Sequence, residues 1–345
     1  MQRGFTMEWN GVWIVMTAVV SVRMNGTSAS TLSGGSPARV SRGACRGWSY
    51  GAARRCNAFL QSIDYVTLSG QPWSITLTIP AATADSPLPD SRVFHAMLRA
   101  MVERCRRMGA IRWTWVIELT RAGTPHVHMT VWLPAGPSPA ERREAIVGAW
   151  LSVTSRRGLQ VSPSAICVRR MTSEGWIQYC AKHGQAGVRN YQRQRDSLPE
   201  SWRDRPGRLW GYGGDWPTAA ERAPYRLQLG QRAFWVYRRR VRAYCVSRAR
   251  QSGDRRWIRQ ARTMLRCPRR ALSAVRPVTV WIPVWVSHAI LLQLQVEYAS
   301  RLEAAGGDLD SVAEWVVEDY IPLSVRRGER ERAEASAAFS AAVRI

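Results

Sequence analysis

Strand-like segments alternate with helices that carry capping signals, and this pattern constrains the fold of the chain more than any other feature. Residues 73–79 (WSITLTI) are β-branched and lie between glycine and proline, which predicts a strand. Asp90 can cap a helix that reaches about Met108. The apolar residues on one face of that helix are Phe94, Met97, Leu98, Met101 and Val102. Regular structure is therefore expected to begin near Pro72.

Two further strands are predicted at residues 111–120 and 126–133. The link between them, residues 121–125 (RAGTP), contains glycine and proline, which is typical of a hairpin. Ser138-Pro-Ala-Glu141 then forms a capping box with proline at the first helical position, and the helix reaches about Ser155. The chain therefore predicts a hairpin followed by a second helix.

A fourth strand is predicted at residues 165–169 and a third helix at about 173–183. The order strand, helix, strand, strand, helix, strand, helix indicates an α+β fold, with one mainly antiparallel sheet and helices packed on one face. Beyond it, the pattern predicts two amphipathic helices at residues 287–305 and 308–320. We therefore expect the sheet domain to be followed by a helical C-terminal region.

The charge of the chain indicates a polyanionic partner. Its 345 residues carry a formal net charge of +25, and nucleic acid is the expected partner of such a surface rather than an anionic membrane. The apolar run at residues 11–22 is too short to span a bilayer. The seven cysteines lack metal-ligand spacing, which fits reduced thiols in a cytoplasmic protein.

Composition divides the chain into four predicted parts. Residues 1–70 are expected to form a flexible N-terminal arm, because residues 24–55 are rich in Ser, Gly, Ala and Arg without periodicity. Residues 71–235 form the folded domain, residues 236–276 an arginine-rich extension, and residues 277–345 an acidic helical region. The acidic region could serve self-association or helicase recruitment.

The arginine-rich extension is the expected DNA-binding surface. Residues 189–276 contain 23 arginines against six acidic residues. The residues expected to contact DNA are Arg238, Arg239, Arg240, Arg242 and Trp257. The interleaved aromatic residues Trp235, Tyr237 and Tyr244 suit base stacking beside these phosphate contacts. A solvated basic helix is the alternative.

The sharpest chemical motif is Pro125-His126-Val127-His128. Alternate residues of a strand point to the same side, so both imidazoles emerge from one face, about 7 Å apart at their Cα atoms. Glu118 lies on the neighbouring strand among apolar residues, where a carboxylate is costly unless it is paired or ligating. The three residues predict a metal site; two surface histidines and an edge glutamate are the alternative.

Tyr179 and Lys182 form a second motif, because they lie one turn apart on a helix and share a face. A phenol has a pKa near 10 and attacks poorly unless an ammonium or a metal-polarised phosphate lies close by. Lys182 is the single lysine among 50 basic residues, which indicates that a compact ammonium is needed there. The alternative is an amphipathic helix whose Tyr179 and Trp176 face the core.

Together these motifs resemble the HUH endonuclease superfamily, with histidine-hydrophobic-histidine on a strand and Tyr-x-x-Lys on a later helix. Residues 73–78 resemble the family's first motif, and Arg208-Leu-Trp-Gly211 resembles a segment of phage and plasmid replication initiators. Tyr179 follows the histidines, as in rolling-circle initiators and single-tyrosine transposases, whereas conjugative relaxases place it first. The resemblance covers roughly residues 70–215.

The resemblance implies Mg²⁺ or Mn²⁺ held by His126, His128 and Glu118. It also implies that Tyr179 attacks single-stranded DNA at a replication origin, leaving a 5′-phosphotyrosine and a free 3′-OH, while Lys182 positions the phosphate. The resemblance further implies that the chain nicks and rejoins DNA to start rolling-circle replication of a phage or plasmid, in the cytoplasm of a bacterial cell or a phage-infected host.

Two departures from the family pattern limit what is carried over. Some members have a second tyrosine on the same helix, which this sequence lacks. A nucleotide-binding P-loop needs a lysine after glycine, and the sole lysine does not provide one, so a host helicase and polymerase are expected partners. A single-tyrosine transposase and a non-catalytic, arginine-rich nucleic-acid-binding protein stay open as alternatives.

Overall fold

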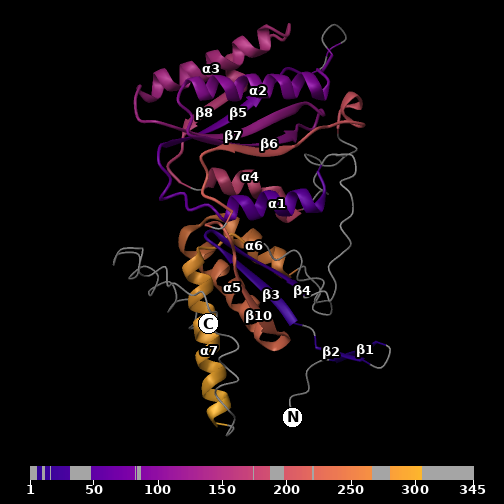
Figure 1. Ribbon diagram of the computed structural model, residues 1–345, viewed down its shortest axis with the longest axis vertical. Helices are drawn as coiled ribbons and strands as arrows, with labels where there is room; N and C mark the ends of the chain where they lie inside the picture. The colour runs from indigo at the N-terminus through magenta and orange to yellow at the C-terminus, as the bar shows by residue number, and fades with distance from the viewer. Residues whose placement is uncertain are drawn as a thin grey trace. The chain divides into compact units, whose positions relative to one another are not determined.

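The computed structural model describes residues 6–9, 12–15, 17–31, 48–81, 83, 87–173, 175–186, 198–219, 221–265 and 280–304. The chain divides into two compact units: Met1–Pro37 together with Arg222–Ile345, and Ala38–Glu221 (Figure 1). We call the first the terminal unit and the second the sheet unit. Within the described ranges, none of the helices combines the length and the apolar character that crossing a membrane requires.

The sheet unit contains a five-stranded antiparallel sheet with the order β8-β5-β7-β6-β9. Its strands are β5 (Gln71–Thr78), β6 (Arg112–Leu119), β7 (Pro125–Leu133), β8 (Ile166–Arg170) and β9 (Trp210–Gly214). The first four confirm the predicted strands, and β6 and β7 form the predicted hairpin. The α+β fold class is therefore confirmed.

The edge strand β9 was not predicted, because its sequence, WGYGG, is rich in glycine, which strands ordinarily disfavour. The neighbouring strand supplies the reason for two of these glycines. A Cβ atom on Gly211 would lie 2.6 Å from the indole of Trp115, and one on Gly213 would lie 2.6 Å from the indole of Trp113. The missing side chains therefore let two tryptophans of β6 lie against the backbone of β9.

Four helices cover this sheet: α1 (Tyr50–Gln61), α2 (Ser91–Arg107), α3 (Pro139–Ser155) and α4 (Gly175–Ala186). The last three confirm the predicted helices. The Asp90 side chain accepts a hydrogen bond from the Val93 amide at 2.8 Å, and Ser138 and Glu141 form the predicted capping box. The described part of the unit also contains two short 3₁₀ helices, η1 (Pro163–Ala165) and η4 (Glu200–Trp202).

The helices lie on both faces of the sheet, α2 and α3 on one and α1 and α4 on the other (Figure 1). The prediction that they pack on one face is therefore wrong. Every residue of the central strand β7 is buried, so side chains on both faces of the sheet need cover from helices.

The terminal unit contains the sheet β10-β3-β4, with β3 (Thr17–Arg23), β4 (Gly26–Thr31) and β10 (Tyr225–Gly230). A two-stranded ribbon, β1 (Thr6–Trp9) with β2 (Val12–Val15), precedes it. Strands β3 and β4 and helix α1 lie within residues 1–70, so they contradict the prediction of a flexible N-terminal arm there. Strand β3 pairs with β10, about 200 residues later in the chain, so no local pattern could reveal this pairing.

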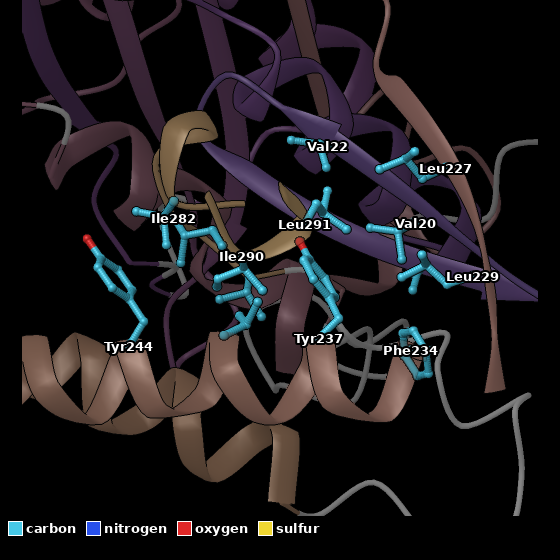
Figure 2. Packing of buried hydrophobic residues seen from close by; sticks show 14 of the residues in the cluster. Val20, Val22, Leu227, Leu229, Phe234, Tyr237, Tyr244, Ile282, Ile290 and Leu291 are labelled. Carbon is cyan, nitrogen blue, oxygen red and sulfur yellow. The ribbon is translucent and has the colours of Figure 1, made fainter. Parts of the chain in front are cut away.

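The described part of the terminal unit also contains helices α5 (Gln231–Ser252), α6 (Arg255–Leu265) and α7 (Val284–Ala304). Helix α7 confirms the helix predicted at residues 287–305, whereas the one predicted at 308–320 lies outside the described residues. Figure 2 shows Phe234, Tyr237 and Tyr244 pointing from α5 into a core with Val20 and Ile290. The arginine-rich segment therefore packs with the N-terminal strands as part of one core.

Candidate active site

Strand register brings Glu118, His126 and His128 to one face of the five-stranded sheet. Glu118 pairs with His126 across β6 and β7, and Val116 pairs with His128. Directly paired residues of antiparallel strands share a face, as do alternate residues along one strand. The five-residue link between the two strands therefore places the carboxylate beside the imidazoles, as the hairpin prediction requires.

The three side chains lie close enough to share one ion. The Nε2 atoms of His126 and His128 are 3.0 Å apart, and the distance from Nε2 of His128 to Oε2 of Glu118 is 3.4 Å. One ligand atom from each residue lies within 4.8 Å of the others, and all three residues are buried. Two imidazole nitrogens and a carboxylate oxygen form a mixed donor set that could hold a divalent cation.

Thr76 on β5 contacts this group from the strand on the other side of β7. It pairs with His128, and its Oγ1 lies 3.1 Å from Nδ1 of His128. An imidazole that binds a cation through Nε2 carries its proton on Nδ1, so the threonine oxygen would then accept that hydrogen bond. Thr76 was not predicted as a site residue, because β5 neighbours β7 in space and is separated from it by a helix and a strand in the chain.

Tyr179, on α4, lies beside the two histidines of β7. Its ring meets that of His128 edge to face, with centroids 5.1 Å apart, and stacks on Trp176 at 5.4 Å and 14°. Trp176 is anchored in turn, because its indole N–H donates to the Met129 carbonyl at 3.1 Å. Since 40% of Tyr179 is exposed, the phenol combines a fixed ring with access from solvent.

Lys182 lies on the same helix, three residues after Tyr179, and its side chain is outside the described part of the structure. Trp176 was considered in the sequence only as a core residue. Its contact with His128, with ring centroids 5.3 Å apart, makes it part of the site.

The residues predicted to bind DNA lie in the terminal unit, and the structure corrects the interpretation of the aromatic ones. Tyr237 and Tyr244 are buried in the core, and Trp257 packs against it, because the helix period brings them to the apolar face. Tyr237 and Tyr244 are therefore core residues rather than exposed stacking surfaces, whereas Trp257 is half-buried and its contact with DNA stays a prediction.

The four arginines have different surroundings. Arg240 forms an ion pair with Glu297 of α7, with an N–O distance of 2.6 Å. The guanidinium of Arg238 lies over the Trp235 ring at 5.0 Å. Arg239 is exposed and Arg242 is half-buried, so Arg239 is the member of this group most open to a phosphate.

Comparison with known proteins gives a consistent result. The model of the replication-associated protein ORF2 family matches residues 72–191, which include the three donors and Tyr179. A protein of Xylella fastidiosa strain 9a5c, provisionally named a replication protein, is 36% identical over 287 residues, which are 81% of this chain and 96% of the relative. A replication-associated protein of Pseudomonas phage Pf3 is 36% identical over 246 residues, which are 71% of this chain and 84% of the relative. No solved structure matches the chain significantly.

Proposed function

This chain belongs to the replication-associated protein ORF2 family, and on that premise we propose that it nicks and rejoins single-stranded DNA at a replication origin, with Tyr179 as the nucleophile. The reaction would start rolling-circle replication of a phage or plasmid. One observation carries the proposal: the ring centroid of the half-exposed Tyr179 lies 5.1 Å from that of His128. His128 itself belongs to a buried group of two imidazoles and one carboxylate.

The donor set fits Mg²⁺ or Mn²⁺. A carboxylate suits either ion, and the imidazoles favour Mn²⁺, which also binds more tightly in the usual order of divalent metals. His126, His128 and Glu118 would hold the ion, and when bound it would polarise the scissile phosphate and offset charge on its oxygens.

The chemical step needs a phenol held close to the phosphate. The Tyr179 oxygen would form a bond to phosphorus while the bond from phosphorus to the 3′ oxygen breaks. The phenol loses its proton and the 3′ oxygen gains one, which leaves a 5′-phosphotyrosine and a free 3′-OH. The covalent link retains the energy of the phosphodiester, so the reverse reaction rejoins the strand without a nucleotide cofactor.

Three neighbours would assist Tyr179. Its ring is held between Trp176 and His128, and this restraint reduces the entropy that would be lost on reaching the reactive geometry. Lys182, one turn along the helix, would position the phosphate or offset its developing charge with a compact ammonium. The free 3′-OH then suits a host polymerase, and a host helicase would separate the strands.

The experiment is to incubate the protein with circular single-stranded DNA of its own replicon and Mn²⁺, and to separate covalent adducts under denaturing conditions. We expect an adduct with the wild type and with the matched control Tyr225→Phe, and none with Tyr179→Phe. An adduct whose peptide maps to another tyrosine would overturn the assignment. A wild type that neither nicks nor forms an adduct would favour a non-catalytic DNA-binding protein, and cleavage confined to the ends of a mobile element would favour a transposase.

A further inference from the structure

A second exposed tyrosine, Tyr212, lies at the edge of the same sheet and packs on the buried ring of Phe59. Phe59 of α1 stacks on it with ring centroids 3.9 Å apart and an angle of 12° between the rings. Trp216 meets Phe59 edge to face at 5.2 Å. Phe59 is only 5% exposed, whereas Tyr212 is 47% exposed. Because Phe59 covers one face of the Tyr212 ring, the exposed surface is concentrated on the opposite face and the hydroxyl edge.

Tyr212 shares the sheet face of the candidate active site. It pairs with Thr114 across β9 and β6, and Thr114 pairs with Thr130 across β6 and β7. Thr130 lies two residues after His128 on β7, and alternate residues of a strand share a face. In the described part of the sheet unit, Tyr179 and Tyr212 are the two exposed large aromatic residues, and both lie on this face.

The register also gives a distance. Tyr212 is two strands away from His128 and displaced by two residues along the sheet. With strands about 4.8 Å apart and a rise of about 3.4 Å per residue, their Cα atoms are about 12 Å apart. A DNA strand with a rise of about 3.4 Å per nucleotide covers that distance in about four nucleotides, and a stretched strand covers it in fewer.

We propose that Tyr212 is a base-stacking subsite for single-stranded DNA, and that it binds a base within about four nucleotides of the phosphate that Tyr179 attacks. The position of that phosphate rests on the proposed function. A ring supported by a buried partner offers a rigid apolar surface and loses little freedom on binding. Stacking tolerates any base, because every base has a π-face. Tyr212 would therefore hold the DNA strand in place without recognising its base sequence.

The first test measures binding in EDTA, where cleavage does not interfere. Two fluorescent probes are compared: a thymidine homopolymer of about eight nucleotides and an abasic strand of the same length. We expect Tyr212→Leu to weaken binding of the homopolymer about 5- to 150-fold, the usual effect of losing one stacked base, and to leave binding of the abasic strand unchanged. Leucine keeps apolar cover over Phe59 and removes the π-face.

Tyr212→Phe is the matched control, because it retains the ring and loses only the hydroxyl. It should bind both probes as the wild type does. Equal losses for both probes in Tyr212→Leu, or a loss in Tyr212→Phe as large as in Tyr212→Leu, would overturn the proposal. The thermal unfolding midpoint of each variant shows whether a loss reflects the fold, and an unchanged affinity of a folded Tyr212→Leu would also refute the subsite.

The second test places the base relative to the cleaved bond. Once the nicking site on the replicon DNA has been mapped, a single abasic nucleotide is moved through the four positions on each side of it. At one position the abasic nucleotide should weaken binding to the wild type. It should have no further effect on binding to Tyr212→Leu, since both changes remove the same contact. A wild type that nicks but shows no sensitive position would refute the subsite alone, whereas a wild type that never nicks would refute the proposed function.

Discussion

Thr76→Val removes one hydroxyl beside the candidate metal site and changes little else in the shape of the side chain. Oγ1 of Thr76 lies 3.1 Å from Nδ1 of His128. When Nε2 of His128 binds a cation, Nδ1 carries the proton and donates it to this oxygen. Valine would leave that N–H without its acceptor in a site where His128 is only 4% exposed. The variant should therefore weaken cation binding without direct loss of a ligand.

The expected size of the effect follows from the burial of this hydrogen bond. A buried donor that loses its acceptor costs about 1–3 kcal/mol, and loss of such supporting contacts lowers metal affinity about 10- to 100-fold. We expect Thr76→Val to bind Mn²⁺ about 10- to 100-fold more weakly than the wild type. Thr76→Ser restores the hydroxyl and should recover most of the affinity.

Calorimetric titration with Mn²⁺ measures this affinity independently of DNA cleavage. Ser74→Ala is a matched control, because Ser74 lies two residues away on the same strand and its hydroxyl donates to the Arg169 carbonyl instead. It should bind Mn²⁺ as the wild type does. If Thr76→Val is folded and also binds Mn²⁺ with wild-type affinity, the hydroxyl does not orient the ligand. If the wild type itself binds no Mn²⁺, the metal site is wrong.

The two units support four further predictions. His128→Ala should abolish adduct formation while single-stranded DNA binding persists, and EDTA should have the same effect on the wild type. If either adduct yield equals that of the wild type with metal, the metal site is refuted. Lys182→Arg should form the adduct slowly, because it keeps the charge and loses the compact ammonium, and a wild-type rate in single-turnover assays would contradict this. Arg239→Gln should reduce the slope of log affinity for single-stranded DNA against log salt by about 0.7 if Arg239 contacts one phosphate; an unchanged slope would exclude that contact. Burial lowers the pKa of His288 to about 4. Between about pH 6.5 and that value, the unfolded chain therefore binds a proton at this histidine, whereas the folded chain does not. The free energy of unfolding, measured by chemical denaturation, should fall as the pH drops through that window. This decrease should be smaller in His288→Asn.

Sequence analysis identified the elements that local signals define. Asp90 and the Ser138–Glu141 box mark the starts of α2 and α3, because a cap satisfies backbone donors within a few residues of itself. Strand β9 escaped because its glycines are explained by Trp113 and Trp115 on another strand. Strand β3 escaped because its partner β10 is far along the chain. Contacts between distant segments leave no periodic signal in either one.

The same distinction explains which site residues were found. Glu118, His126 and His128 lie on strands joined by a short link, so alternation and a hairpin suffice to bring them together. Thr76 required the order of strands in the sheet, which follows from packing rather than from the chain. For Tyr179 the spacing to Lys182 showed a shared helix face, and only the contact between α4 and the sheet shows that Tyr179 meets His128.

The arginine-rich helix α5 shows how a composition can mislead about the position of its aromatic rings. Tyr237 and Tyr244 are seven residues apart, which is close to two turns of helix, so both lie with Val241 on the face that packs into the core (Figure 2). Burial raises the pKa of Tyr237 to about 12, as expected for a phenol removed from water. These two tyrosines are therefore closed to DNA, whereas the guanidinium groups of the helix could bind phosphates with strong salt dependence and little sequence preference. Contact with bases would fall instead to the sheet unit, where Tyr212 is exposed on the same face as Tyr179.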